Sequence, residues 1–266
     1  MNTISIERMA LEAVGRTAVA VFAYRDGRGR PMAWPVTPYI DGEKIVVTST
    51  LAYIRKAQHV RRDGRVALLA DGLHVMGRAS VQADASGNVF VAKLLEQELR
   101  KYPPARQIMR FPARRQLFSW YFGRVIMTFE PLDVREVPGD DRCTLIAVDE
   151  SGFPRITPID EPPASASAFT PLPLGETNNV SIPDGASTVL YHLEPTMSDL
   201  RQEVLRGEIR DGTFSVQTRI GTLAAPPRAG WLDQLRGQLE LHRRGRKSRK
   251  VIRDWDIAQV PEHTKS

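Results

Sequence analysis

The sequence predicts a mainly β fold of the α+β class, built from two antiparallel barrels in tandem with flanking helices. Short apolar runs follow one another from Ala18 to Val81 and are joined by tight turns such as "RDGRGR" and "DGEK". Such turns favour hairpins over parallel βαβ units. Landmarks of this first half recur later at a fixed offset, and 266 residues suffice to bury two cores. We therefore expect one domain at residues 1–136 and a second at 137–266.

The first half is expected to begin with an amphipathic helix in "MNTISIERMALEAV". Strands follow in "TAVAVFAY", "PMAWPVTPYI", "KIVVTST", "RVALLA" and "LHVMGRASV". The prolines Pro31, Pro35 and Pro38 restrict the second strand to a sheet edge, because proline has no N–H to donate to a ladder. Apolar residues at helical spacing in "NVFVAKLLEQELRKY" predict a helix, and "GRVIMTFEPLDVREV" predicts the strand that closes this half.

An offset of 123 residues relates the two halves. The matched pairs are Pro31 with Pro154, Pro35 with Pro158 and Val66 with Val189. A duplication explains them, and chance coincidence of two proline-bearing hairpins is the alternative. The second half then has strands in "STVLYHL", "QEVLRGEI" and "TFSVQTRI" and a helix whose buried face carries Leu232, Leu235 and Leu239. The stretch 161–179, rich in Pro, Ser and Ala, replaces one strand and a turn of the first half.

Several classes of protein are excluded by composition. No apolar run approaches the ~20 residues that a membrane helix needs, and the N-terminal stretch lacks the pattern of a signal peptide. We therefore expect a cytoplasmic protein. The single cysteine, Cys143, cannot form an internal disulfide, and no Cys/His spacing of the zinc type is present. We expect no bound metal.

The chain is basic, with a formal net charge of +6 and a pI near 9.7, which favours anionic partners. Part of the excess lies in "HRRGRKSRK", residues 242–250. We interpret this run as a solvated helix end, because it lacks interleaved aromatic residues on which bases could stack. A patch that binds RNA or a membrane is the alternative, which the composition of this run favours less.

A second cationic segment, "TSTLAYIRKAQHVRRDGRV" (48–66), connects two predicted strands. Its hydroxyls Thr48, Ser49 and Thr50 precede a helical turn that carries Arg55 and Lys56. Hydroxyls, free N–H groups of a helix N-terminus and a lysine favour a phosphate ion, although a solvated helix face is the alternative.

The stretch from Ala18 to Val81 resembles the flavin-binding split β-barrel family related to pyridoxamine 5'-phosphate oxidase. The likeness rests on ordered elements: "DGRGRP", the pair Pro35 and Val36, "DGEKIVVTST", a lysine five residues before "RRD", and "RVALLAD". The chain departs from the family pattern at His59, where asparagine is usual, and at Gly64, where proline is usual. The resemblance implies tandem split β-barrels of the antiparallel Greek-key type, the second a degenerate copy.

The resemblance also implies a bound FMN or 8-hydroxy-5-deazaflavin coenzyme and assigns its contacts by position. The phosphate would be held by Thr48, Ser49, Thr50, Arg55 and Lys56. The ring would be lined by Trp34, Pro35, Val36 and Thr37. Gly77 would mark a β-bulge and direct Arg78 at the ligand, although a plain barrel bend explains Gly77 as well.

The second half offers an internal comparison. Asn179 stands 123 residues after Lys56, with Asn178 beside it, and "TPLPL" near Thr170 replaces the hydroxyls. We therefore expect no second phosphate site. The resemblance implies a site between two subunits, because split barrels usually bind the cofactor at a homodimer interface. Either the degenerate copy stands in for a subunit and forms an intrachain pseudo-dimer, or two chains form a homodimer.

The expected function is that of an oxidoreductase, which transfers hydride between the cofactor and a small-molecule substrate. No catalytic acid or base is identified from the residues. A non-catalytic carrier of flavin or another anionic ligand is the alternative. Haem binding through His74, His192 or His242 is a third hypothesis.

Overall fold

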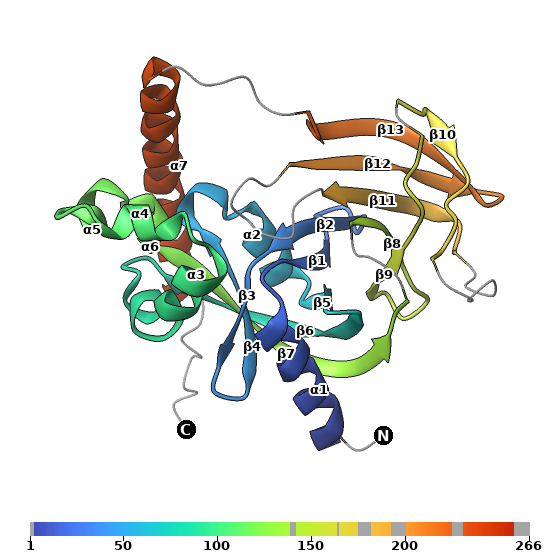
Figure 1. Cartoon of the computed structure of the whole chain (residues 1–266), viewed down its shortest axis with the longest axis horizontal. Coiled ribbons are helices and arrows are strands. Elements are labelled where there is room, and N and C mark those ends of the chain that lie inside the picture. The colour runs from blue at the N-terminus through green and yellow to red at the C-terminus, as the bar shows by residue number, and fades with distance from the viewer. Residues whose placement is uncertain are drawn as a thin grey trace, which may run out of the picture.

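Two antiparallel sheets, with helices grouped on the first, make up the molecule (Figure 1). The computed structural model describes residues 3–138, 142–163, 165–174, 182–192, 201–224 and 231–257. The elements of the first half are α1 (Thr3–Arg16), β1 (Ala20–Arg25), β2 (Pro31–Val36), β3 (Pro38–Asp41), β4 (Lys44–Thr50), the 3-10 turn η1 (Leu51–Tyr53), α2 (Arg55–Arg62), β5 (Arg65–Ala70), β6 (Leu73–Asp84), the π-helical turn η2 (Phe90–Leu94), α3 (Leu95–Lys101), α4 (Ala105–Met109), α5 (Arg114–Leu117), α6 (Ser119–Phe122) and β7 (Arg124–Glu136). Those that follow are β8 (Cys143–Val148), β9 (Pro154–Pro158), β10 (Ala168–Phe169), β11 (Gly185–His192), β12 (Gln202–Arg210), β13 (Thr213–Thr222) and α7 (Trp231–Ile257).

The first sheet has the order β2-β1-β5-β6-β7-β4-β3. The proline-rich strand of the sequence splits in two, and its parts, β2 and β3, lie at opposite edges. The predicted edge position is thus confirmed for Pro31, Pro35 and Pro38, whose missing N–H groups cost the sheet no interior ladder bond. Phe22 and Leu68 are buried inside the barrel, while their neighbours along β1 and β5 face outward.

The C-terminal helix α7 packs on the first half rather than on the second. In Figure 1 it stands beside the short helices, on the side of the first sheet away from β12 and β13. Ile252 and Trp255 belong to the core of the first barrel, and α7 contacts η1 and α6. The expected buried face is wrong, because Leu235 and Leu239 are exposed, whereas Gly245, Ile252 and Trp255 are buried. The side chain of Leu232 lies outside the described residues.

The second sheet repeats the strand order of the first in reduced form. Its order, β9-β8-β11-β12-β13-β10, corresponds to β2-β1-β5-β6-β7-β4. The helices between β6 and β7 have been replaced by the turn Asp211-Gly212 between β12 and β13, in which both residues have positive φ. The architecture is therefore that of tandem split β-barrels, the second with a much shorter counterpart of β4.

The ladder registers relate the halves residue by residue. Tyr24 pairs with Met32 as Ala147 pairs with Arg155, so that β1 and β2 keep the offset of 123. Pro31 therefore matches Pro154, as expected. Leu145 stands 123 residues after Phe22 and is its equivalent. Leu145 pairs with Val189, and Phe22 pairs with Leu68. Val189 is therefore equivalent to Leu68 and not to Val66. The two-residue slip preserves which side of the strand faces the core.

Equivalent faces of the two sheets pack against each other and form what we call the inter-sheet interface. Val21, Ala23, Ala33, Ala67 and Leu69 of the first sheet meet Ile146, Ile156, Leu190 and Val204 of the second. By the registers, Ala23 is equivalent to Ile146, Ala33 to Ile156 and Leu69 to Leu190. Such use of the same patch on both sides is the geometry of an isologous dimer, here within one chain.

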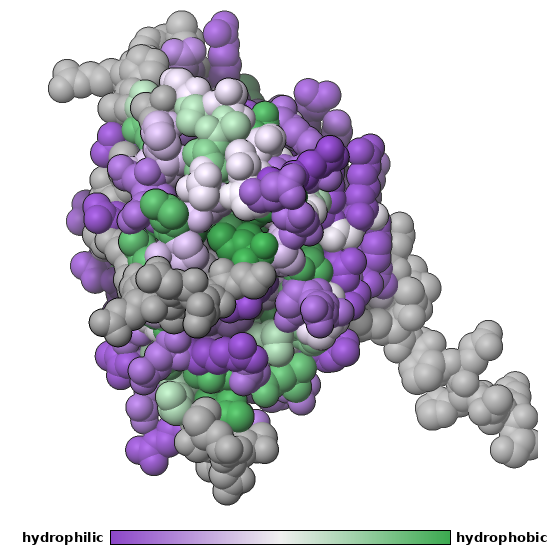
Figure 2. Space-filling view, turned by 90° about the vertical axis from the view of Figure 1, so that its right-hand side faces the viewer, coloured by the Kyte–Doolittle hydropathy of each residue, from purple (hydrophilic) through white to green (hydrophobic). Residues whose placement is uncertain are grey.

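Polar and apolar residues are interspersed on the side of the molecule that the second half forms. Figure 2 shows this side with purple and white residues around separate green patches, one near the centre and others toward the lower edge. Along β13, Phe214 is buried whereas Arg219 is exposed. No described helix is long and apolar enough to cross a membrane.

Candidate functional site

The end of β4 runs into η1 and then α2, and this connection contains the predicted phosphate ligands. Thr48 and Ser49 are buried, and their hydroxyls are used within the protein. Thr48 Oγ1 accepts a hydrogen bond from Arg124 (3.1 Å), and Ser49 Oγ donates to the carbonyl of Tyr53 (2.5 Å). Thr50 Oγ1, by contrast, is buried and has no hydrogen-bond partner. Of the three hydroxyls, the structure leaves only that of Thr50 available.

A buried polar network that the sequence analysis missed lies behind this strand end. Arg124 forms an ion pair with Glu98 (2.9 Å), and the carboxylate of Glu98 also accepts hydrogen bonds from the hydroxyls of Tyr39 and Tyr121 (2.5 Å each). Burial, and then the charge of Glu98, raise the pKa of Tyr39 well above its ordinary value. Since a lone buried ion is costly, the network fixes Arg124 beneath β4. The one sequence signal for this network is that Glu98, a charged residue, stands at a position where the helical pattern places apolar residues.

Lys56, the predicted phosphate lysine, lies half-buried near Arg124. It makes no hydrogen bond or ion pair with any residue that the structure describes. Burial, and then the charge of Arg124, lower the pKa of Lys56 to about 8. The charged form of a lysine is disfavoured when it lies near another cation without a hydrogen-bond acceptor. A bound anion would stabilise this charged form and raise the pKa back toward its ordinary value.

Another face of α2 presents cations toward the first barrel's aromatic residues. His59 stacks on Tyr24, with ring centroids 5.9 Å apart, and Nδ1 of His59 is buried without a partner. Trp34 Nε1 donates to the hydroxyl of Tyr24 (3.0 Å). Burial lowers the pKa of His59, and the charges of Arg62 and Arg55 lower it further. Arg55 therefore acts on this group, whereas the charge that acts on Lys56 is that of Arg124.

The second half contributes an arginine to this group. Arg206 on β12 pairs with Thr188 on β11, and Thr188 Oγ1 donates to the carbonyl of Pro31 on β2 (2.7 Å). The contact places Arg206 close to the first barrel, and its charge acts on both Tyr24 and His59. Nε of Arg206 is buried without a hydrogen-bond partner. Sequence reasoning missed Arg206 because the contact depends on the packing of the two halves.

The corresponding position on the other side of the pseudo-dimer has lost these groups. By the ladder registers, Ala147 replaces Tyr24, Thr157 replaces Trp34, and Met76 is the counterpart of Arg206. Phe169 is equivalent to Ile45, because each pairs with the corresponding phenylalanine of the neighbouring strand. The positions of Thr48 and Ser49 are therefore taken by Leu172 and Pro173, and the strand-end hydroxyls are absent there as well. Thr170 is exposed. Asn178 and Asn179 lie outside the described residues.

The remaining predicted ring contacts are less accessible than expected. Pro35 and Val36 are buried, whereas Trp34 and Thr37 are half-buried. Arg78 is exposed and lies over the ring of Phe153 in the second half, with 5.6 Å from its guanidinium carbon to the ring centroid. Arg78 thus contacts the second half of the chain rather than the end of β4.

The two departures from the family pattern have structural reasons. His59 is the ring that stacks on Tyr24. At Gly64 an added Cβ would lie 2.9 Å from the carbonyl oxygen of Ala79, so the close approach of α2 to β6 requires glycine there. Neither departure removes a cation of the site.

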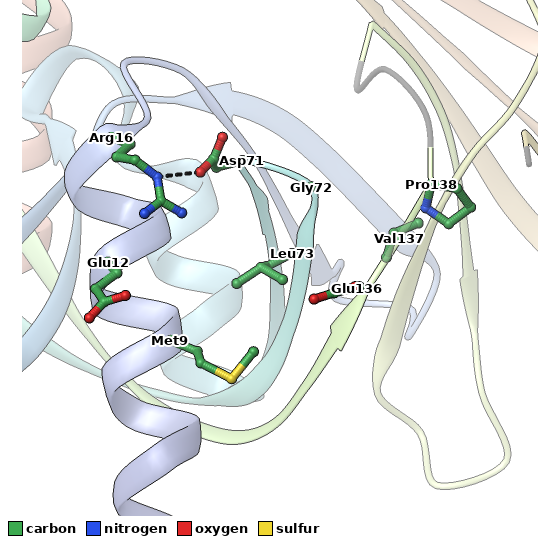
Figure 3. A pocket seen from close by; sticks show the side chains of 9 residues that line it. All are labelled: Met9, Glu12, Arg16, Asp71, Gly72, Leu73, Glu136, Val137 and Pro138. Atoms are coloured by element: carbon green, nitrogen blue, oxygen red, sulfur yellow. Dashed lines mark hydrogen bonds and ion pairs between the residues drawn. The ribbon is translucent and has the colours of Figure 1, made fainter.

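A cavity of about 510 Å³ lies elsewhere, between α1, the β5–β6 turn and the end of β7 (Figure 3). Met9 and Leu73 point into it, and Arg16 forms an ion pair with Asp71 at its rim (2.6 Å). It shares no residue with the site described above.

Comparison with known proteins finds solved structures of similar fold. No family model matches the chain, and no curated protein matches it. Similar solved structures include a putative pyridoxamine 5'-phosphate oxidase from Listeria innocua, at 20% identity over 49% of this chain and 96% of that one, with a TM-score of 0.36. An F420 reductase has 19% identity over 47% and 94%, with a TM-score of 0.34. The haem storage protein HutZ from Vibrio cholerae has 14% identity over 49% and 94%, also at 0.34. The chain is thus similar to split-barrel proteins over about half of its length.

Proposed function

We propose that the chain binds a phosphorylated flavin-type cofactor, FMN or a deazaflavin coenzyme, between α2 and the inter-sheet interface. In this proposal the protein is an oxidoreductase that transfers hydride between the cofactor and a small-molecule substrate. Its sheet order and the ordered sequence elements between Ala18 and Val81 support the comparison with split barrels.

The observation that carries the proposal is the unpartnered ammonium of Lys56. A half-buried lysine normally finds a carbonyl or carboxylate, as Lys101 does by donating to the carbonyls of Val14 and Pro38 (2.7 and 2.8 Å). Lys56 has no such acceptor among the described residues, and Thr50 Oγ1, at the end of the preceding strand β4, is buried and unbonded. A phosphate group would satisfy both groups at once.

The second group of residues fits the rest of such a cofactor. Half-buried Trp34 offers an aromatic edge on β2 and is held by its hydrogen bond to buried Tyr24, and Arg55 and Arg206 bring positive charge from both halves of the chain. A flavin supplies hydride chemistry through its own ring, so the protein needs only to bind, orient and shield it. Lys56 and Thr50 would hold the phosphate, and Arg206 would stabilise negative charge on the ring or its substrate.

The proposal is tested by titrating the purified chain separately with FMN, deazaflavin coenzyme and haemin, followed by absorbance and fluorescence. We expect saturable binding of one of the two flavin-type cofactors at one site per chain, and reduction of the bound cofactor by a hydride donor. Binding without turnover with any hydride donor or acceptor would support the carrier hypothesis instead. Saturation by haemin alone would contradict the proposal. His74 and His192 are both buried and lie outside the site.

Lys56→Met and Lys101→Met form a matched pair for this test. Burial lowers the pKa of both lysines to about 8, but only Lys101 holds protein carbonyls. We expect Lys56→Met to weaken cofactor binding about ten- to a hundredfold with little loss of thermal stability. Lys101→Met should lower the melting temperature and leave the affinity of the folded protein unchanged. Equal affinities for the parent and Lys56→Met would refute the phosphate assignment.

A further inference from the structure

Positive charge is concentrated in two segments of the chain. Residues 100–118 and 242–253 together hold 13 of the 37 Lys and Arg residues and none of the 31 Asp and Glu. The remainder has 24 Lys and Arg against those 31 acids, a formal net charge of −7. The basic character of the protein is therefore a local property and not a general one.

The fold joins these two segments, which lie more than 120 residues apart in the sequence. Arg249 Nη2 on α7 donates to the carbonyl of Ser119 at the start of α6 (3.3 Å). Gly245 lies so close to Trp120 that an added Cβ would stand 2.8 Å from its Cβ. Helix α7 thus runs directly beside the segment that contains α4, α5 and α6 (Figure 1).

Most of these cations face solvent. All eight residues from 110 to 117, "RFPARRQL", are exposed. We call the exposed surface of both segments the basic face; its cations are Arg100, Arg106, Arg110, Arg114, Arg115, Arg243, Arg244, Arg246, Lys247, Lys250 and Arg253. Lys101 is not part of it, because its ammonium is held inside by two carbonyls.

Exposed aromatic rings lie among these cations, although the basic run itself contains none. Phe111 is 48% exposed and packs at a tilt on Phe118, which adjoins Ser119. Tyr53 in η1 is 55% exposed and lies near enough to Arg244 to feel its charge. The basic run has no aromatic residues of its own for bases to stack on, but the fold brings exposed rings from other segments close to it.

A membrane surface fits this face less well. A helix that binds a bilayer needs an apolar face opposite its cations. In residues 242–253 of α7 the apolar side is already used, because Gly245 and Ile252 are buried against the first barrel and only Val251 is exposed beside the charges. What remains for a partner is dense positive charge with isolated planar rings and two separate aliphatic side chains, Leu117 and Val251, which do not form a continuous apolar face along α7.

We propose that the basic face binds single-stranded nucleic acid, with its arginines and lysines on phosphates and with Phe111 and Tyr53 stacked on bases. This function is independent of cofactor binding. The binding should be largely indifferent to base sequence, because ring stacking and phosphate contacts carry no base-specific hydrogen bonds.

The test is a fluorescence polarisation titration of the full chain with a fluorescein-labelled oligouridylate of about 20 nucleotides, at several salt concentrations. We expect Arg246→Gln/Lys247→Gln to weaken binding about ten- to thirtyfold at about 0.1 M salt, and to reduce the slope of log K against log salt by about 1.4. Lys44→Gln/Arg210→Gln removes the same charge from exposed positions outside the basic face and is the matched control. Equal losses in the two double variants would overturn the proposal.

Aromatic variants separate base stacking from simple charge attraction. Phe111→Ala and Tyr53→Ala should each weaken binding about five- to a hundredfold while leaving the salt slope unchanged. If both variants bind like the parent, the face attracts polyanions only and the proposal is wrong. Binding to phosphatidylserine vesicles without binding to the oligonucleotide would likewise overturn it, in favour of a membrane surface.

Discussion

Gly77 and Gly207 occupy equivalent β-bulges in the two sheets. Each bulge interrupts the register just before its glycine, between Met76 and Gly77 in β6 and between Arg206 and Gly207 in β12. An added Cβ would collide with the carbonyl oxygen of Glu130 at the first and with that of Ser215 at the second. A phenylalanine, Phe129 or Phe214, lies beside each glycine. The repeat of backbone irregularity, close approach and aromatic neighbour supports a duplication independently of the proline landmarks.

Gly77→Ala and Gly207→Ala should both destabilise the protein, by about 1 to 3 kcal/mol each, because either strand must shift to admit a methyl group. Urea unfolding measures the loss. Gly237→Ala is the control, since nothing lies within 4 Å of a Cβ at this helical position. That change should leave the free energy of unfolding unchanged or raise it by up to ~1 kcal/mol. A parent-like Gly207→Ala variant would mean that the bulge does not constrain the second sheet.

The fold could be predicted from the sequence because turns and prolines act locally. "DGRGR" and "DGEK" specify hairpins, and the prolines of β2 and β3 permit only edge positions, which the sheet order confirms. The Val66–Val189 alignment was wrong by two residues, since a slip of two keeps the alternation of buried and exposed side chains. Such a slip leaves no trace in an apolar pattern.

The candidate site was predictable only in part. Lys56 and Arg55 could be identified as candidates because they lie in a short cationic connection between two strands, next to a series of hydroxyls. The internal hydrogen bond of Thr48 was not predictable, because it comes from Arg124, which is held by Glu98, and both residues are distant in the sequence. Arg206 enters the site only through packing between the halves, which no local pattern encodes.

Arg206→Met should weaken cofactor binding about tenfold, since one charge from the second half is lost while most of the side chain's volume stays. Flavin titration of the variant measures the loss. Arg219→Met removes a cation from the neighbouring strand β13 that is already paired with Glu203 (2.7 Å), and it should leave the affinity unchanged. Identical titration curves for the parent and Arg206→Met would show that the second half does not take part in the site.

Removal of the α7 contact should destabilise the first barrel. Ile252→Ala deletes a fully buried side chain from its core and should cost about 2 to 4 kcal/mol, whereas Leu239→Ala, at a position that is 69% exposed, should cost less than about 0.5 kcal/mol. Thermal and urea unfolding compare the two. A chain that ends near residue 241 should consequently be less stable than the parent. Its cofactor affinity must therefore be measured on the fraction that is folded. Equal stability of Ile252→Ala and the parent would mean that α7 is not part of the barrel core.

His74 should make the inter-sheet interface sensitive to acid. It is 7% exposed on β6, and by register it stands where Val204 stands in the second sheet, a residue of the interface core. Burial, and then the charges of Arg135 and Arg155, lower its pKa to about 4, whereas Asp133 and Asp149 oppose that shift. In the unfolded chain His74 titrates near the ordinary value of about 6.5. The unfolded state therefore binds the proton first, and the stability present above that pH is lost as the pH falls toward 4.

The expected loss between about pH 7.5 and about pH 5 is about 2 kcal/mol for this one group. Urea unfolding of the parent and of His74→Val at both pH values measures it. Valine is the residue of the second sheet at the equivalent position, so the replacement keeps an apolar contact with the interface. The difference in free energy of unfolding between the two proteins should shift by about 2 kcal/mol in favour of the variant on acidification. A difference that stays constant with pH would mean that His74 can accept its proton without opening the interface.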